Sequence, residues 1–288
     1  MRLTTKIIIG IILSIFLLTL LHIIVYSFTD RRNYKRTSPE RESIKIPEAG
    51  RAGIPIEPGR VVVLELDQSS EYNYYLRNED NGLFIQPAAA SGDENTLFIP
   101  ESLKDCVSHQ TNNDTLIVKL NMDKVREKYA AQAETPTKKV AGGSVHFQYV
   151  SGVNMYMHVS NVHVINKMHD TQVFIKNMTT DSILIQSFGK IRLESCKANV
   201  IEPYSSQITL TNCVAKSLTL DLDRLNEWKI DNCDIEKRIY TGSRRNHRIT
   251  TDANDVAAIT WLPKNKDAEL SLIFKGEAVQ IVTQAIND

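Results

Sequence analysis

Five short segments in the second half of the chain share one pattern of apolar and polar positions. Each reads apolar, variable, apolar, variable, then Asn or Ser, then Val, Met or Cys. The segments are Met157–Val162, Val173–Met178, Ile191–Cys196, Ile208–Cys213 and Trp228–Cys233. Their first residues are 16, 18, 17 and 20 positions apart. A repeat of this length, built on strands with a period of two, is typical of a β-solenoid.

A second apolar patch follows each of these segments. The patches are Val164–Ile165, Ile183–Ile185, Val200–Ile201, Leu218–Leu220 and Ile239–Tyr240. Two or three strands joined by turns would close one rung, and stacked rungs would pair their backbones at about 4.8 Å. We therefore expect an all-β fold, with a single-stacked solenoid of about five rungs over residues 143–288.

Two columns of side chains should run along this stack. Asn161, Asn177, Ser195, Asn212 and Asn232 share one register at a turn. Asn tolerates left-handed backbone geometry, and its amide can bond the rungs above and below, so we interpret this ladder as structural.

The next position holds Cys196, Cys213 and Cys233, which should face inward as small apolar thiols. We expect three buried free thiols. One disulfide between neighbouring rungs is the alternative, because adjacent rungs are close enough for it.

An irregular β-region is expected over residues 60–142, before the solenoid. Strands are predicted at 60–66, 73–76, 82–85, 96–100 and 114–120, where apolar and β-branched residues lie between turn-forming segments. Residues 122–133 favour a helix throughout, and residues 134–139 read as a loop.

The N-terminal part of the chain indicates a membrane anchor. Residues 7–28 are 22 positions with no acidic or permanently basic side chain, long enough to cross a bilayer as a helix. A cleaved signal peptide is the competing interpretation, but its apolar region is normally shorter and ends in small residues. Residues 29–59, rich in Pro and charge, should form a tether. The expected organisation is thus 1–28, 29–59, 60–142 and 143–288.

The orientation of the anchor has two solutions. Arg31, Arg32, Lys35, Arg36 and Arg41 follow the apolar segment, and the positive-inside rule would keep the large domain in the cytoplasm. Long domains can nevertheless be exported despite flanking charge, and a short N-terminal tail is the usual layout of an exported, anchored protein. We expect a single-pass protein of a bacterial inner membrane with a periplasmic domain.

Charge and cysteine content exclude several functions. The chain has 34 basic and 34 acidic residues, so it has no net positive field to gather nucleic acid. Its four cysteines form no Cys-x-x-Cys pair, which argues against zinc or redox sites of that type.

Candidate chemistry is sparse, and we predict no catalytic, cofactor-binding or metal-binding residue. Arg244, Arg245 and Arg248 form a basic cluster that could contact an anionic surface, with a solvated loop as the alternative. Asp221 and Asp223 should share one face of a strand. No Gly-rich phosphate loop or nucleophile motif is present.

The strand Asp114–Val118 and the later degenerate rungs from Met157 to Ile239 resemble the auto-transporter adhesin head (GIN) domain family of bacterial envelope proteins. The resemblance covers about the last two-thirds of the chain. It implies an envelope β-solenoid with no defined activity, and it transfers no functional residues.

Three functions remain open at this stage. The first is a membrane-anchored envelope module that binds or scaffolds a protein or glycan, without catalysis. The second is a cytoplasmic scaffold of the bactofilin kind, which would polymerise through exposed rungs. The third is a polysaccharide-active β-helix enzyme, which would need clustered Asp, Arg and Lys around one groove.

Overall fold

The computed structural model describes residues 18–19, 44–57, 61–68, 72–76, 81–87, 94–133, 137–140, 143–169, 171–252 and 258–275. Residues 1–42 and 43–288 form two separate units. The predicted membrane segment 7–28 lies outside the described residues, apart from Leu18 and Thr19. Within the described ranges no helix combines the length and apolar character needed to cross a bilayer.

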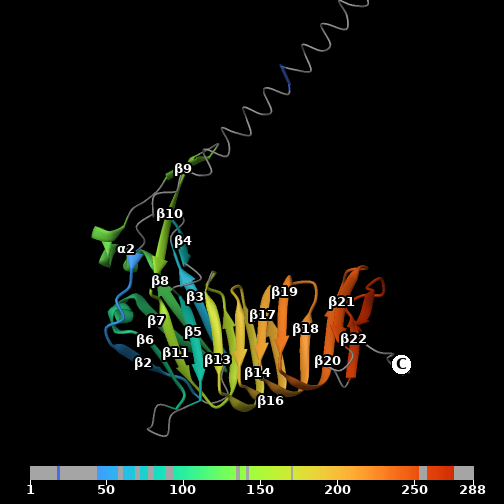
Figure 1. Cartoon of the computed structure of the whole chain (residues 1–288). Coiled ribbons are helices and arrows are strands. Elements are labelled where there is room, and N and C mark those ends of the chain that lie inside the picture. The colour runs from blue at the N-terminus through green and yellow to red at the C-terminus, as the bar shows by residue number, and fades with distance from the viewer. Residues whose placement is uncertain are drawn as a thin grey trace, which may run out of the picture. The chain divides into compact units, whose positions relative to one another are not determined.

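The unit 43–288 is predominantly β-structure, as predicted, and is dominated by two large sheets (Figure 1). In order across the first sheet lie β19 (Glu227–Asp231), β17 (Gln207–Thr211), β15 (Ile191–Glu194), β13 (Gln172–Lys176), β5 (Gly82–Gln86), β11 (Asn154–His158), β6 (Thr96–Pro100) and β2 (Arg51–Pro55). In order across the second lie β22 (Ala258–Pro263), β20 (Asp234–Gly242), β18 (Val214–Asp221), β16 (Lys197–Tyr204), β14 (Thr179–Ser187), β12 (Val162–Asn166), β3 (Val61–Asp67), β8 (Thr115–Asn121) and β7 (Val107–Asn112).

Two smaller sheets complete the β-structure. One contains β1 (Ile44–Lys45), β10 (Gly143–Ser151), β4 (Tyr72–Leu76) and β9 (Thr137–Val140). The other, within the described residues, consists of β21 (His247–Asp252) and β23 (Leu270–Lys275). The described helical segments of this unit are η1 (Glu101–Cys106), α2 (Met122–Lys128) and η2 (Ala130–Gln132).

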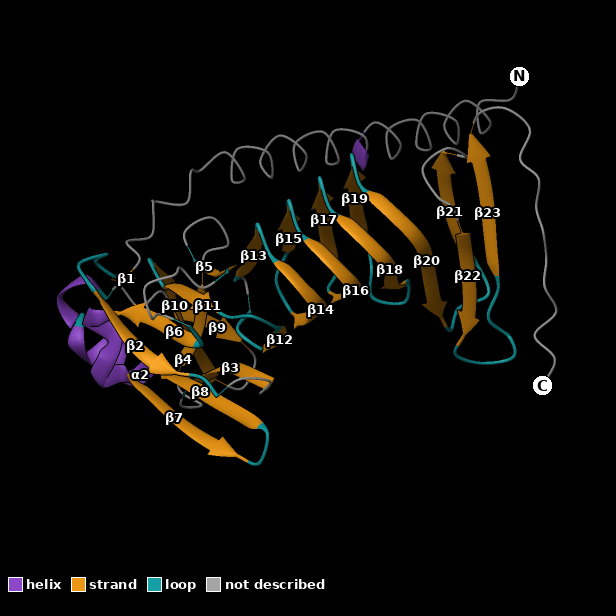
Figure 2. Ribbon diagram, turned by 90° about the horizontal axis from the view of Figure 1, so that it is seen from below, coloured by secondary structure: helices purple, strands orange, loops and turns teal. Residues whose placement is uncertain are grey.

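From β13 to β20 the chain alternates between the two large sheets. We call each successive pair of strands a rung: β13–β14, β15–β16, β17–β18 and β19–β20. Neighbouring rungs pair in parallel and in register, so that Ile191, Ile208 and Trp228 are neighbours across three strands. Figure 2 shows the two sets of strands as facing rows. Alternation turns the apolar positions inward between them, where Ile191, Leu193, Ile208 and Leu210 are almost fully buried.

One strand from the first half of the chain enters the stack. The spacing of the repeats predicts that Met157 and Val173 lie on adjacent rungs, but β5 pairs with β11 on one side and with β13 on the other. Its Phe84 ring stacks on Tyr156 and Phe174, with centroid separations of 5.0 and 5.1 Å. Alternation alone could not reveal this insertion, because β5 carries the same pattern as its neighbours.

The individual strand predictions before residue 121 are confirmed within a residue or two by β3, β4, β5, β6 and β8. The predicted helix is too long. It ends at Lys128 and is followed by the short η2, because the backbone of Tyr129 leaves helical geometry, with φ −113° and ψ 29°. The predicted loop is also wrong in part, since Thr137–Val140 pairs with β10 as β9.

The predicted tether must be shortened, because residues 44–57 belong to the folded unit. They form β1 and β2, and Ile44, Ile46, Ile54 and Ile56 are all less than a tenth exposed. These alternating isoleucines supply apolar surface whose burial offsets the ordering of a Pro-rich segment. The predicted boundary at residues 142 and 143 likewise does not separate two compact units.

The β2–β7 end of the stack is covered by helical turns. Leu103 and Cys106 of η1, with Met122 and Val125 of α2, are buried in the same core as the strands. The α2 helix begins at Asn121, whose side chain accepts a hydrogen bond from the Lys124 N–H at 2.9 Å. These segments act as a cap on the apolar interior at this end.

Candidate functional site

The sharp turn inside each rung is made by the residues of the predicted ladder. Asn177, Ser195, Asn212 and Asn232 have φ angles of 56°, 55°, 53° and 50°. Their backbones bond the next rung: the N–H of Ser195, for example, donates to the Thr211 carbonyl at 2.9 Å. The Asn232 amide also donates to the Asn212 side-chain oxygen at 2.6 Å.

Asn161 departs from this ladder, because it is not among the described residues with positive φ. The reason is the inserted strand. β11 lies beside β5, whereas β12 lies beside β3 and β14. The segment that links β11 to β12 therefore passes from one layer of the stack to the next, whereas the other turns stay within one rung. The Asn161 side chain instead accepts a hydrogen bond from the Thr180 hydroxyl at 2.7 Å.

The cysteine column follows directly after these turns. Cys196 and Cys213 are buried, Cys233 is half-buried, and all are free thiols. The Cys213 N–H donates to the Cys233 sulfur at 3.3 Å, which places neighbouring thiols against each other. A hydrogen bond with Cys213, together with burial, raises the pKa of the Cys233 thiol. Such a thiol is protonated at neutral pH, as expected for a packing role.

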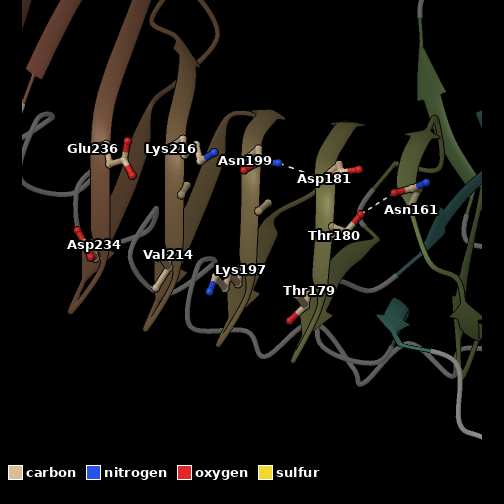
Figure 3. A pocket seen from close by; sticks show the side chains of 12 residues that line it. Asn161, Thr179, Thr180, Asp181, Lys197, Asn199, Val214, Lys216, Asp234 and Glu236 are labelled. Carbon is tan, nitrogen blue, oxygen red and sulfur yellow. Dashed lines mark hydrogen bonds between the residues drawn. The ribbon is translucent and has the colours of Figure 1, made fainter.

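A groove runs across the starts of β14, β16, β18 and β20, with a volume of about 470 Å³. Two rows of side chains line it, and each of the four strands contributes one side chain to each row (Figure 3). The first row is Thr179, Lys197, Val214 and Asp234, and the second row is Asp181, Asn199, Lys216 and Glu236. Between the rows lie Ala198 and Ala215, which are buried.

Most of the charged groups in this groove are available to a ligand. Asn199 donates to Asp181 at 3.1 Å. By contrast, Lys197, Lys216, Asp234 and Glu236 are exposed, and their side chains make no hydrogen bond or ion pair within the described part of the chain. The groove therefore presents solvated lysines on β16 and β18 and solvated carboxylates on β20.

A second polar cluster joins the end of β18 and the turn after it to the turns after β20 and β22. Lys264 lies 2.6 Å from an Asp221 oxygen and 3.1 Å from an Asp223 oxygen. Asp223 also accepts from the Ser243 N–H at 2.8 Å and lies 3.1 Å from His247. The sequence places the two aspartates on one face, but it gives no sign of Lys264, which is about forty positions away in the chain.

The groups of this cluster keep Asp223 and Lys264 in their charged forms. Burial favours the neutral form of Asp223, but the Ser243 N–H and the Lys264 ammonium outweigh it and hold the pKa of this carboxyl well below its usual range. Burial likewise acts against charge on Lys264, yet the two aspartates raise its pKa. A proton donor or acceptor for catalysis needs a pKa near the working pH, whereas the pKa values of Asp223 and Lys264 are moved away from neutrality.

The arginines predicted to contact an anionic surface are not one free patch. Arg244 donates to the Asp223 carbonyl at 2.9 Å, and Arg245 pairs with Asp267 at 3.3 Å. Arg248 is exposed on β21.

Histidines do not gather into a metal site either. His158 is buried, with Gln86 2.7 Å from its ring and Phe98 packed edge-on against it. The described residues contain no group of three or more metal-ligating side chains.

Comparisons with known proteins give weak structural similarities only. No protein-family model matches the chain, and no curated protein does. A "putative adhesin" from Bacteroides fragilis aligns with a TM-score of 0.39 and 10% identity, over 81% of this chain and 97% of that one. A "putative lipid binding protein" from Parabacteroides distasonis aligns with a TM-score of 0.37 and 8% identity, over 83% and 100%. A "putative adhesin" from Parabacteroides merdae gives 0.32 and 9%, over 81% and 99%. TM-scores this low do not establish a common fold, and the resemblance to the GIN domain family stays a prediction.

Proposed function

We propose that the chain is a membrane-anchored β-solenoid of the bacterial envelope that binds an extended glycan polymer without catalysis. The in-register parallel rungs, with a left-handed Asn or Ser at one turn of each, support the solenoid description. A stack of this kind presents the same face again at each rung. That geometry suits a long, repetitive ligand better than a compact one.

The observation that carries the proposal is the groove across four successive strands. Its two rows supply Lys197 and Lys216 near the middle and Asp234 and Glu236 toward one end, all solvent-facing. Rows with both signs of charge complement a polymer that carries amines and carboxylates. Peptidoglycan, whose stem peptides carry both, has this chemistry.

The anchor is proposed from residues 7–28, with export of the large domain. The tether that remains, residues 29–43, is short. Fifteen residues reach at most about 50 Å when fully extended. An anchored and exported domain would meet cell-wall polymers in the periplasm.

The two alternative functions have less support. End-to-end polymerisation needs open rungs, but the β2–β7 end is capped by η1 and α2. A polysaccharide-active enzyme would need clustered Asp, Arg and Lys, and the Asp221–Asp223–Lys264 cluster is the nearest approach to it. The charged groups of this cluster pair with each other, which favours a structural role.

Co-sedimentation of the full-length protein in detergent micelles with purified peptidoglycan sacculi tests the proposal. We expect saturable binding that Lys197→Glu combined with Lys216→Glu weakens at least tenfold. The matched control is Lys176→Glu combined with Lys229→Glu, an equal charge change on first-sheet strands outside the groove, which should bind like the natural protein. Equal binding by both double variants, or no binding by the natural protein, would overturn the proposal.

A further inference from the structure

A second groove crosses the outer face of the second sheet, at the opposite end of its strands from the first groove. It has a volume of about 330 Å³ and lies over β12, β14, β16, β18 and β20. Tyr204 lines it at the end of β16, five residues after Asn199 of the first groove, which is about 16 Å of extended strand. The two grooves are therefore separate places on one face.

The lining of the second groove combines apolar contact with hydrogen-bond acceptors. Its half-buried apolar side chains are Ile165 and Leu184. Glu202 accepts a hydrogen bond from the Thr219 hydroxyl at 3.4 Å, and Asp221 pairs with Lys264 at 2.6 Å. A carboxylate has about four lone-pair sites, so both acids can accept further hydrogen bonds. The groove can thus receive hydroxyl groups, but its two acids repel a ligand that carries carboxylates along its whole length.

A cluster of three rings and one guanidinium stands beside this groove. We call His169, Phe188, Tyr204 and Arg224 the edge cluster. The His169 ring stacks on Phe188, with centroids 4.5 Å apart. The central carbon of the Arg224 guanidinium lies 4.9 Å from the Phe188 centroid and 4.6 Å from the Tyr204 centroid. Because Tyr204 belongs to both the edge cluster and the groove lining, the cluster borders the groove.

The Arg224 guanidinium keeps its hydrogen-bond donors for a ligand. Its side chain is half-buried and makes no hydrogen bond or ion pair among the residues that the structure describes. Phe188, which lies against it, is 43% exposed. Aromatic rings beside a guanidinium hold its plane and leave its N–H fork free, and this fork matches a carboxylate with two parallel hydrogen bonds. Arg224 is therefore pre-organised to bind a carboxylate.

The sheet beneath the groove excludes an added peptide strand. β14, β16 and β18 each pair with a strand on both sides, so their backbone groups are already bonded. Addition of a peptide strand needs an open sheet edge. A ligand here must be recognised by side chains, through apolar contact, acceptors for hydroxyl groups and one cation. A sugar offers hydroxyl donors and apolar C–H faces, and a sugar acid adds one carboxylate.

We propose that the second groove and Arg224 form a binding site for a sugar acid in a glycan whose neighbouring sugars are uncharged. The sugar carboxylate accepts hydrogen bonds from the Arg224 guanidinium, and hydroxyls of the adjacent neutral sugar donate to Glu202 and Asp221. A glycan with a carboxylate on every sugar is disfavoured, because those two acids repel it. This site goes beyond the proposed function, since the first groove contributes nothing to it.

A tetrasaccharide of alternating glucuronic acid and N-acetylglucosamine is a suitable probe, labelled with a fluorophore at its reducing end. Its carboxyl-reduced form has the same sugars with a hydroxymethyl group in place of each carboxylate. Binding is followed by fluorescence anisotropy with the full-length protein in detergent micelles. We expect the acid form to bind roughly tenfold tighter or more, as for one charge-assisted hydrogen-bond pair. Tetragalacturonate, with a carboxylate on every sugar, should bind more weakly than the alternating probe.

Variants of Arg224 test its role through the ratio of the two affinities. Arg224→Gln should remove the preference, so that the acid and reduced forms bind equally. Arg224→Lys keeps the charge without the planar fork and should retain a smaller preference. Arg192→Gln is the matched control, because Arg192 also lies near an aromatic ring, 5.5 Å from the Phe174 centroid, but on the first sheet. It should keep the full preference.

Four results would overturn this inference. They are no binding of the acid tetrasaccharide, equal binding of the acid and reduced forms, a preference that survives Arg224→Gln, and a preference lost in Arg192→Gln. The Lys197→Glu, Lys216→Glu variant separates this site from the first groove. It should bind the tetrasaccharide like the natural protein, so failure of the first groove and failure of this site are distinguishable outcomes.

Discussion

Left-handed backbone geometry in the described non-glycine residues falls on five asparagines and one serine. Four of these six residues form the turns that connect the two sheets, at Asn177, Ser195, Asn212 and Asn232. Asparagine and serine are small and polar, so they tolerate this region and can bond their own backbone or the next rung. The sequence alone indicates this column because the residue type recurs in one register.

Replacing a ladder asparagine by a β-branched residue should destabilise the stack. For Asn212→Val we expect a loss of about 1–2 kcal/mol, because a branched Cβ clashes in the left-handed region. Asn212→Gly is the matched control: it also loses the 2.6 Å bond to Asn232 but accepts the positive φ. Urea denaturation of both variants checks this. Equal stability of the two would show that backbone strain at this turn is unimportant.

The Asp223 carboxylate should make the stability of the C-terminal rungs depend on acid pH. Its pKa is depressed in the folded state, so its contribution is present above the unfolded value of about 3.9 and is lost as the pH falls below it. Urea unfolding between pH 6 and pH 2.5, measured on the natural protein and on Asp223→Asn, should show a smaller loss of stability in the variant. Asp267→Asn, which removes a more exposed carboxylate paired with Arg245, should keep the natural pH dependence.

At the scale of elements, period-two alternation predicts most strands but not their neighbours. Every strand candidate before residue 121 is found, and so are the five repeats. The pairing of β5 between β11 and β13 could not be predicted, because alternation specifies which face is buried and carries no information on the order of strands. The same limit concealed Lys264, which the fold brings to Asp221 and Asp223 from a later turn.

The stacked rings of Tyr156, Phe84 and Phe174 should stabilise the inserted strand β5. Phe84→Ala removes two stacked contacts, at 5.0 and 5.1 Å, and we expect a loss of about 1–3 kcal/mol. Phe84→Leu keeps much of the apolar area without the ring and should lose less. Hydrogen exchange of β5 amides gives a local readout, and faster exchange in the Ala variant than in the Leu variant is the expected order. Unchanged hydrogen exchange of the β5 amides in both variants would contradict a role for the stacked rings in holding β5.

At the scale of the whole molecule, the balance of charge in the sequence does not show how the charges are distributed over the fold. The net charge of zero conceals local rows of both signs, and only the fold shows that Lys197, Lys216, Asp234 and Glu236 line one groove. The repeat spacing predicts that such residues lie on neighbouring rungs, but which of them line the groove depends on the course of the strands in the fold.

Protease accessibility in cells tests the proposal that the domain is held at the inner membrane and faces the envelope. Trypsin is added to intact cells and to cells whose outer barrier has been opened, and cleavage after Arg41 is followed by immunoblotting. We expect digestion only after the outer barrier is opened, because the domain would lie between the two membranes. Protection that persists until the inner membrane is lysed would place the domain in the cytoplasm and contradict the proposed function.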